Sequence, residues 1–303
     1  MSAKIALVTA REALALDEDM PPLVLALQSQ GAEVETPCWD DPGVDWSRYD
    51  KVVLRSTWDY VERIEEFLDW ADRCAIQARL LNPPAIVRWN TDKHYLVQLA
   101  HAGVPVVPTR FVEPGTDPTV ELERFLAGKP GAFTVGSCDA FDQFVVKPSI
   151  GAGSRDTARY TRADRDAALS HLARLLAAGR STMLQPYLDR VDEYGETAVI
   201  YIGGEFSHAI RKGPLLRLGD DLVSGLFAPE HITPREPDSD EHAVAAAAFA
   251  TIAEANPLYA RIDLIRDDHA APVVLELELT EPSLFFVHAP DAAGRFADAL
   301  LEV

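Results

Sequence analysis

Acidic side chains alternate with apolar ones in two segments near the end of the chain. Glu276 and Glu278 alternate with leucines in one segment, and Asp263 alternates with isoleucine and leucine in the segment before it. Because the side chains of a strand alternate between its two faces, both segments are predicted to be strands with their acids on one face. If the strands pair across the loop 267–272, the three carboxylates converge, and like charges that close repel unless a cation lies among them.

Oxygen-only ligands favour Mg²⁺ or Mn²⁺, and Mg²⁺ also binds substrate phosphates. The pattern therefore predicts a metal site formed by Asp263, Glu276 and Glu278. The alternative is an ordinary antiparallel hairpin with a solvated polar face, which is the favoured interpretation for either segment taken alone.

A lysine followed by a glycine-rich loop indicates a phosphate-binding site. Lys147 lies in the otherwise apolar segment 144–148. Its ammonium group must reach solvent or an anion, because an unpaired buried charge is very costly. Gly151, Gly153 and Ser154 follow directly, and small residues let backbone N–H groups approach phosphate oxygens closely. The alternative for the loop is a plain β-turn.

A second lysine, Lys93, follows Asn90 and Thr91, either of which is suited to cap a helix. The alternative for Lys93 is an exposed position in the first turn of that helix. We predict that Lys93 and Lys147 converge on phosphates beneath the loop 151–154. We also expect this loop to be mobile without nucleotide, because glycine-rich backbone is entropically costly to order.

A Gly-Gly pair at 203–204 predicts a two-residue hairpin. Such a hairpin pairs Ile202 with Glu205, and counting back along both strands places Glu196 opposite Arg211. The alternative for that pair is an ordinary cross-strand ion pair, which contributes little where it is exposed.

The segment 55–60 follows an apolar strand and carries both signs of charge. Open parallel sheets usually bind ligands at the carboxyl ends of their strands. Arg55 is suited to bind a carboxylate through two hydrogen bonds, Asp59 to pair with an amino group, and Trp58 and Tyr60 to wall the site. A packing role for the segment is equally supported. In that case Trp58 and Tyr60 lie in the core, and Arg55 and Asp59 pair locally.

Apolar periodicity predicts the elements that must position these residues. Strands are expected at 4–10, 51–55, 104–112, 144–148, 182–188, 197–202, 205–212, 259–265 and 273–279, and helices at 20–30, 62–77, 90–102, 164–178, 243–254 and 291–301. The early alternation of strand and helix predicts an N-terminal parallel sheet. An Asn-Pro-Pro interruption at 82–84 marks the first boundary, so we expect domains at 1–84, 85–188 and 189–303.

The composition of the 303-residue chain, 48% hydrophobic and 25% charged, allows a buried core and argues against disorder. No apolar run is long enough for a membrane span, and the short run 5–8 predicts a strand rather than a secretory signal. The net charge of −20 disfavours nucleic acid and anionic membranes as partners. Cys38, Cys74 and Cys138 lack a metal-binding spacing and predict a reduced, cytoplasmic protein.

Taken in this order, the residues resemble the ATP-grasp superfamily, within the branch of glutathione synthetase-like and ribosomal-protein-modifying glutamate ligases. The resemblance covers about residues 85–290. It implies an α/β fold in which an N-terminal parallel-sheet domain precedes two subdomains that clasp ATP. In this family a strand beside the glycine-rich loop binds adenine through its backbone, and 183–188 matches it.

The resemblance also implies particular roles. The ATP-binding positions are Lys93, Lys147, Gly151, Gly153, Ser154, Gln185, Tyr187 and Leu188, with Asp192 and Glu193 as candidates for ribose. Arg211 and Lys212 match the basic end of a strand near the transferred phosphoryl group, and with Lys147 they form the implied catalytic set. Glu278 departs from the pattern, because the family usually has Asn there, and the extra charge affects the number or preference of metal ions.

Segments 55–60, 211–214 and 278–284 resemble a small-molecule subgroup that includes the cycloserine synthetase, which cyclises O-ureido-serine; Ser283 thereby joins the substrate residues. The implied reaction needs ATP and Mg²⁺ (or Mn²⁺): a substrate carboxylate attacks the γ-phosphate, and the acyl phosphate then loses phosphate to a nitrogen. The expected partner is a small amino-acid-like molecule, and the sequence leaves the oligomeric state open, a homodimer included.

Three other functions compete with this one. A phosphotransferase would stop after moving the phosphoryl group to a hydroxyl, and a ligase of other specificity would join amino acids or dipeptides. A nucleotide-binding protein without catalysis is disfavoured, because both lysines, Arg211 and all three acids are retained.

Overall fold

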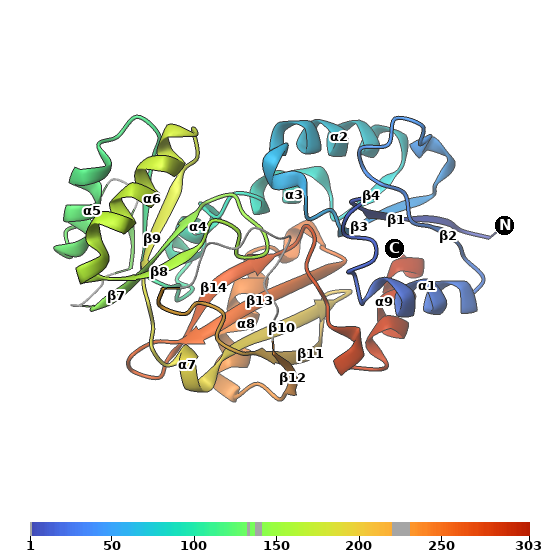
Figure 1. Ribbon diagram of the computed structural model, residues 1–303. Coiled ribbons are helices and arrows are strands. Elements are labelled where there is room, and N and C mark those ends of the chain that lie inside the picture. The colour runs from blue at the N-terminus through green and yellow to red at the C-terminus, as the bar shows by residue number, and fades with distance from the viewer. Residues whose placement is uncertain (1, 132–133, 137–140, 220–230) are drawn as a thin grey trace.

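The computed structural model describes residues 2–131, 134–136, 141–219 and 231–303, and its strands form three sheets (Figure 1). Cys138 lies outside these ranges, while Cys38 and Cys74 are free thiols. No helix in the described ranges is both long and apolar enough to cross a membrane.

The N-terminal sheet is parallel, as predicted, with its strands in the order β2-β1-β3-β4. These are β1 (Lys4–Thr9), β2 (Glu33–Glu35), β3 (Lys51–Ser56) and β4 (Arg79–Leu81). Helix α2 (Ile64–Gln77) packs on one face, and α1 (Met20–Ser29) with the C-terminal α9 (Ala292–Glu302) packs on the other. Coverage of both faces explains the nearly continuous apolar runs of β1 and β3. Short 3₁₀ turns, Trp46–Arg48 and Tyr60–Glu62, flank β3.

The central sheet is antiparallel, in the order β6-β5-β9-β7-β8. Its strands are β5 (Thr109–Val112), β6 (Thr134–Val135), β7 (Gln143–Pro148), β8 (Ala158–Thr161) and β9 (Thr182–Pro186). Helices α5 (Pro118–Leu126) and α6 (Arg165–Ala177) supply the apolar side chains of its core, and the 3₁₀ turn Arg162–Asp164 leads into α6.

The linker between these two sheets differs from the single helix predicted over 90–102. Two short helices form instead, α3 (Pro84–Asn90) and α4 (Tyr95–His101). The predicted strand over 104–112 is also shorter, because prolines cannot donate to a ladder and 105 and 108 are both proline. Val106 pairs with Val274 as an isolated parallel bridge, which ties the linker to the C-terminal sheet.

The C-terminal sheet is antiparallel, in the order β12-β11-β10-β13-β14. Its strands are β10 (Glu196–Ile202), β11 (Glu205–Lys212), β12 (Ile232–Arg235), β13 (Tyr259–Arg266) and β14 (Pro272–Glu278). Helix α8 (Ser239–Ala250) packs on one face. It begins earlier than predicted, because Asp238 and Glu241 form a capping box. The remaining short elements are α7 (Val191–Tyr194) and 3₁₀ turns at Ala253–Ala255 and Phe286–His288.

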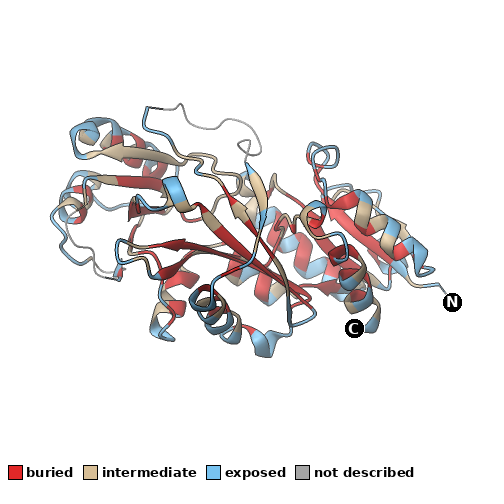
Figure 2. Cartoon of the chain, turned by 90° about the horizontal axis from the view of Figure 1, so that it is seen from below, coloured by how far each residue is buried: buried red, intermediate tan, exposed pale blue. Residues whose placement is uncertain are grey.

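Each sheet falls within one of the three predicted segments, whose exact bounds as domains stay a prediction. Helix α9 departs from this order, because it returns from the C-terminal sheet to pack against α1. Buried residues run along the strands, and most exposed positions lie on outer helices and loops (Figure 2). The core therefore follows the sheets. On the face of the C-terminal sheet opposite α8, the apolar side chains of Ala198, Ile200 and Ile202 pack in one group with α1 and α9, and the polar side chains of Arg261 and Asp263 lie on the same face.

Candidate active site

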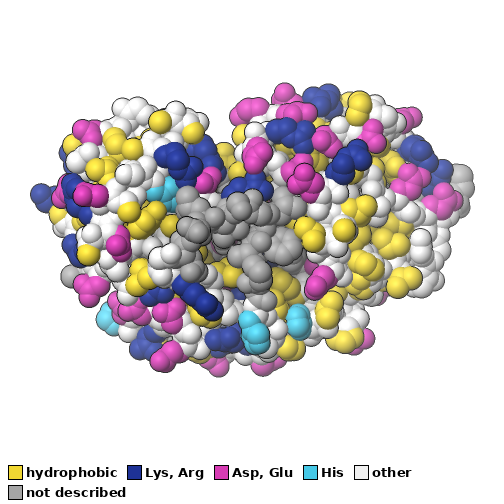
Figure 3. Space-filling model, in the orientation of Figure 1, with side chains coloured by type: hydrophobic (Ala, Val, Ile, Leu, Met, Phe, Trp, Pro, Cys, Tyr) yellow, Lys and Arg dark blue, Asp and Glu magenta, His cyan; other side chains and the backbone are white. Residues whose placement is uncertain are grey.

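A cavity of about 500 Å³ is lined by residues from the segments of all three sheets. A notch separates the lobe of the central sheet from the N-terminal lobe, with Lys and Arg side chains beside it (Figure 3). Most of the predicted site residues line this cavity: Trp58, Tyr60, Lys93, Lys147, Gly151, Gly153, Ser154, Gln185, Tyr187, Leu188, Lys212, Glu276, Glu278 and Ser283. Six do not: Arg55, Asp59, Asp192, Glu193, Arg211 and Asp263.

The two predicted phosphate-binding lysines lie beside the glycine-rich loop. The backbone N–H of Lys93 donates to Ser149, and its Nζ donates to the carbonyl of Gly151 (2.8 Å) and pairs with Glu276 (2.7 Å). Although burial opposes its charge, Glu276 holds the pKa of Lys93 above its usual value. Burial lowers the pKa of Lys147, against the attraction of Glu276. Both ammonium groups thus border one space, which an anion would fit.

Lys212, and not Arg211, reaches this space. Ile202 pairs with Glu205 as predicted, but one extra residue near Ser207 shifts the register, so that Glu196 faces Lys212. A β-bulge of this kind exchanges the two faces of the strand beyond it. The Lys212 ammonium pairs with Glu196 and with Asp263 (2.7 Å).

Arg211 lies on the other face of β11, where it donates to the backbone carbonyls of Tyr194 (2.7 Å) and Glu193 (2.8 Å). The predicted pairing of Glu196 with Arg211 is therefore wrong, because hairpin counting assumed an unbroken ladder.

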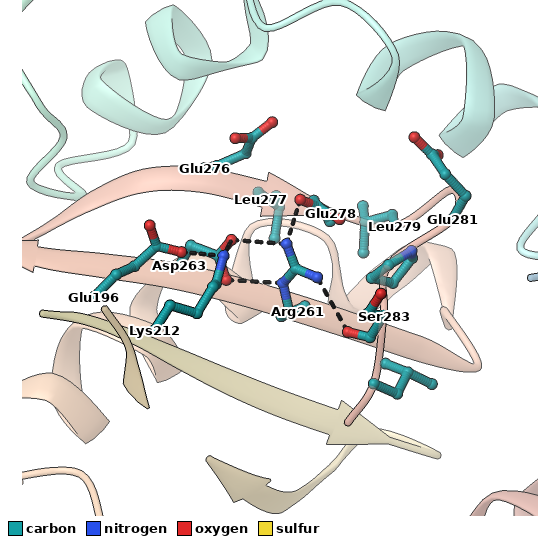
Figure 4. Close-up of polar contacts among 12 residues, drawn as sticks. Glu196, Lys212, Arg261, Asp263, Glu276, Leu277, Glu278, Leu279, Glu281 and Ser283 are labelled. Carbon is teal, nitrogen blue, oxygen red and sulfur yellow. Dashed lines mark hydrogen bonds and ion pairs between the residues drawn. The ribbon is translucent and has the colours of Figure 1, made fainter. Parts of the chain in front are cut away.

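The three predicted metal carboxylates lie on one face of two paired strands. Asp263 is opposite Glu276, and Glu278 is opposite Arg261. Arg261 donates through two nitrogens to Asp263 (2.9 Å each) and also contacts Glu278 (Figure 4). Against the effect of burial, Arg261 and Lys212 hold the pKa of Asp263 well below its usual range.

Glu276 and Glu278 differ from Asp263 in their exposure to the cavity. Their side chains are 24% and 27% exposed, while that of Asp263 is 2% exposed. Burial raises the pKa of Glu278 to about 7, with Arg261 opposing the rise. Within the described ranges, no group of three or more His, Cys, Asp or Glu side chains is arranged to hold a metal ion. The chain's own cations occupy this acidic face instead.

Sequence reasoning did not include Arg261, Glu196 or Glu281 among the site residues, although all three line the cavity. Arg261 and Asp263 are two residues apart on one strand, so their side chains share a face. This spacing could have marked Arg261 as a site residue. Strict alternation along 273–279 predicts Leu275 on the face of Leu277. The pairing of β13 with β14 shifts by one residue between Asp263 and Leu264, so this prediction is wrong. Leu275 packs instead with the apolar group of Val107, Leu188, Ile265 and Val273.

That apolar group and the end of β9 form one wall of the cavity. Gln185 donates to Thr109 (2.8 Å), and the guanidinium of Arg159 lies 3.4 Å from the centre of the Tyr187 ring. Asp192 contacts Tyr187 and Arg159 from α7, outside the cavity lining. A flat ligand group fits this wall better than a charged one, because its lining is apolar and aromatic.

The segment 55–60 divides between site and core. Trp58 and Tyr60 line the cavity, whereas Asp59 accepts hydrogen bonds from Trp39 (2.8 Å) and Arg63 (2.7 Å). Arg55, in β3, is 1% exposed, and its guanidinium lies beside the rings of Tyr259 and Phe296. Its guanidinium donates to the carbonyl of Pro282 (3.1 Å) and lies 3.5 Å from Asp19.

Arg55→Ala is expected to lower thermal stability rather than substrate affinity. Removing one partner of a buried ion pair costs about 3–5 kcal/mol, because it leaves the other charge uncompensated. Asp19 would be that charge, at 3% exposure. Thermal unfolding and steady-state kinetics measure the two effects separately. A raised substrate KM at unchanged melting temperature would instead place Arg55 in contact with the substrate.

Comparisons with known proteins agree with this geometry. Residues 5–82 match the family model of the N-terminal domain of D-cycloserine synthetase DcsG. The chain is 44% identical over 303 residues to the cycloserine biosynthesis protein DcsG of Streptomyces lavendulae, covering 98% of each. A crystal structure of D-cycloserine synthetase DcsG superposes with a TM-score of 0.90 at 42% identity, covering 99% of both chains. A D-alanine–D-alanine ligase from Bacillus anthracis superposes with a TM-score of 0.66 at 14% identity, over 99% of this chain and 97% of that one.

The three sheets, with two lysines, a glycine-rich loop and acidic strands around one cavity, define an ATP-grasp ligase. This is the class of enzyme that joins a carboxylate to a nitrogen and releases ADP, so the predicted fold and enzyme class are confirmed. Within that class, the chain belongs to the family of the D-cycloserine synthetase DcsG.

Proposed function

We propose that this enzyme uses ATP to close O-ureido-serine into the cycloserine ring. The observation that carries the proposal is one cavity of about 500 Å³ that joins the phosphate-binding elements to a small wall of Trp58, Tyr60 and Ser283. Its size suits a nucleotide and a small amino acid together. The 44% identity to the cycloserine biosynthesis protein over the whole chain supports the same substrate.

In the proposed complex, Lys93, Lys147 and the backbone of 151–154 bind the phosphates of ATP. The adenine ring lies on the apolar wall beside Leu188. Glu276 and Glu278 line the cavity and offer carboxylate oxygens of the kind that Mg²⁺ or Mn²⁺ binds, and the phosphates of ATP would supply the further ligands that the described side chains alone do not. Asp263 lies behind them, paired with Arg261 and Lys212. A bound Mg²⁺ would neutralise phosphate charge during transfer.

The residues of the chain position the reacting groups. Lys212 and Arg261 present cationic groups to the cavity, where a substrate carboxylate would attack the γ-phosphate. The nitrogen next to the side-chain oxygen of the same molecule then displaces phosphate from the acyl phosphate and closes the ring. Because cycloserine lacks the carbamoyl group on that nitrogen, the balance requires its release, with one water, as carbon dioxide and ammonia.

The test is to incubate the enzyme with O-ureido-serine, ATP and Mg²⁺ and to measure ADP and cycloserine together. We expect equal amounts of both, and a hydroxamate when hydroxylamine is present, because hydroxylamine traps an acyl phosphate. A phosphorylated hydroxyl product without hydroxamate would indicate a phosphotransferase instead. ADP release that needs a second amino acid would indicate a ligase of other specificity.

We propose that the enzyme is cytoplasmic and that its partner is its small-molecule substrate. The free thiols of Cys38 and Cys74 support a reducing compartment, and the net charge of −20 disfavours nucleic acid. A homodimer is compatible with this proposal, and sedimentation of the purified enzyme measures it.

A further inference from the structure

Glu281 is a carboxylate at the end of the cavity formed by the N-terminal segment. The hydroxyl of Tyr60 lies close enough to its side chain to lower the pKa of the carboxyl, and the indole N–H of Trp58 donates to its backbone carbonyl (3.0 Å). Tyr60 is 3% exposed, so its hydroxyl is largely shielded from solvent on that side. Two elements far apart in the sequence thus hold Glu281 in place against the cavity.

Glu281 differs in its partners from the three glutamates on the C-terminal sheet that line the cavity, and it differs from Glu18, which lines the cavity too, in being less exposed to solvent. Glu276 pairs with Lys93, Glu278 with Arg261 and Glu196 with Lys212. Across the described ranges, no Lys, Arg or His nitrogen lies within 4.0 Å of the Glu281 side chain. Figure 4 shows it apart from the dashed contacts around Arg261.

The surroundings of Glu281 favour a cation from outside the chain. Burial and the negative charge of Glu278 together raise the pKa of its carboxyl to about 8, although Tyr60 and the more distant Lys93 oppose the rise. Such a group becomes a stable carboxylate at neutral pH when a positive charge lies beside it. Among the described residues, the chain supplies no Lys, Arg or His nitrogen close enough to form an ion pair at this position.

We propose that Glu281 binds the α-ammonium group of the amino-acid substrate and so determines which end of it faces ATP. The inference rests on the proposed function and adds a specificity-determining residue to it. Lys212 and Arg261 attract the substrate carboxylate, so an ammonium group at Glu281 orients the molecule from its other side. Trp58 and Tyr60 then limit the size of what lies between the two charges.

The test compares O-ureido-serine with 3-(ureidooxy)propanoate, the same compound without the amino group. For Glu281→Gln we expect the KM for O-ureido-serine to rise about 30-fold or more, because one partner of an enclosed charge pair is lost. The KM for ATP and the melting temperature should stay unchanged. The compound without the amino group should react equally poorly with wild type and variant, since it has no ammonium group to lose.

Three further variants make the result specific. Tyr60→Phe keeps the carboxylate but loses its hydrogen bond, and should raise the KM for O-ureido-serine less than Glu281→Gln does. Glu65→Gln, on the exposed first turn of α2, is the matched control and should behave as wild type. Glu18 also lines the cavity, but it is exposed to solvent, and Glu18→Gln should have the smaller effect.

Several outcomes would overturn the inference. An unchanged KM in Glu281→Gln, an equal loss with both compounds, or a larger effect of Glu18→Gln each contradicts it. If the wild-type enzyme turns over O-ureido-serine and Glu281→Gln has the same KM for it, this inference is wrong and the proposed function stands. A wild-type enzyme that produces no cycloserine contradicts the proposed function, and this inference falls with it.

Discussion

Lys147→Ala is expected to lower kcat/KM for ATP by about 10²–10³, the usual cost of removing a fixed electrostatic contact to the transition state. Lys147 lies in an apolar strand, lines the cavity and faces the glycine-rich loop across the space that Lys93 also borders. Burial lowers the pKa of its ammonium group, so the free protein gains little from this charge. Burial disfavours the charged form of Lys147, and the side chain borders the cavity. A cation in this position is suited to bind an anion.

The measurement is ATP-dependent turnover together with nucleotide affinity by calorimetry. Lys129→Ala is the matched control, because Lys129 lies exposed on the same central part of the chain, away from the cavity. We expect the melting temperature of Lys147→Ala to equal that of wild type or exceed it. Unchanged ATP kinetics in this variant would remove the phosphate site from the proposal.

Lys212 and Arg211 are expected to behave oppositely, although they are neighbours in the sequence. Lys212→Met should lower kcat by about 10² or more, because Lys212 is the charged group of β11 that faces the cavity. Arg211→Ala should stay within about threefold of wild type, because its bonds to two backbone carbonyls are exposed structural contacts.

Folding must be measured for the same pair of variants. Loss of Lys212 leaves Glu196 and Asp263 without their shared cation, at a cost of about 3–5 kcal/mol. Lys212→Arg restores a charge at the site and should recover stability before activity, since the guanidinium is larger and differs in geometry. The reverse ranking, with Arg211 essential and Lys212 dispensable, would contradict the bulge in the hairpin and restore the register counted from the sequence.

Features set within one element could be predicted from the sequence. The alternation of Glu276 and Glu278 with leucines places both acids on one face of β14, as expected from the geometry of a strand. Lys147, alone in an apolar strand before a glycine-rich loop, marks the phosphate side of the cavity for the same reason. The parallel N-terminal sheet follows from its alternation of strands and helices.

Features that depend on how elements meet were decided only by the tertiary structure. One extra residue near Ser207 brings Lys212 rather than Arg211 to the cavity, and no local pattern marks it. The sequence predicts Arg55 as a ligand for the substrate, yet its guanidinium bonds to the carbonyl of Pro282 and lies beside the ring of Phe296 in α9. No local sequence pattern marks Glu281, because its surroundings depend on Tyr60, which is far away in the chain.

The physical reason is the range of the interactions involved. Periodicity determines the faces of a strand through the geometry of its own backbone, within a few residues. Register, coverage and charge pairing depend on contacts between distant segments, and a shift of one residue reverses which side chains face the site. The sequence by itself therefore determined the class of chemistry. The tertiary structure decided which of two neighbouring cations faces the cavity, and it placed Glu281 beside Tyr60 without an ion pair to any other described residue.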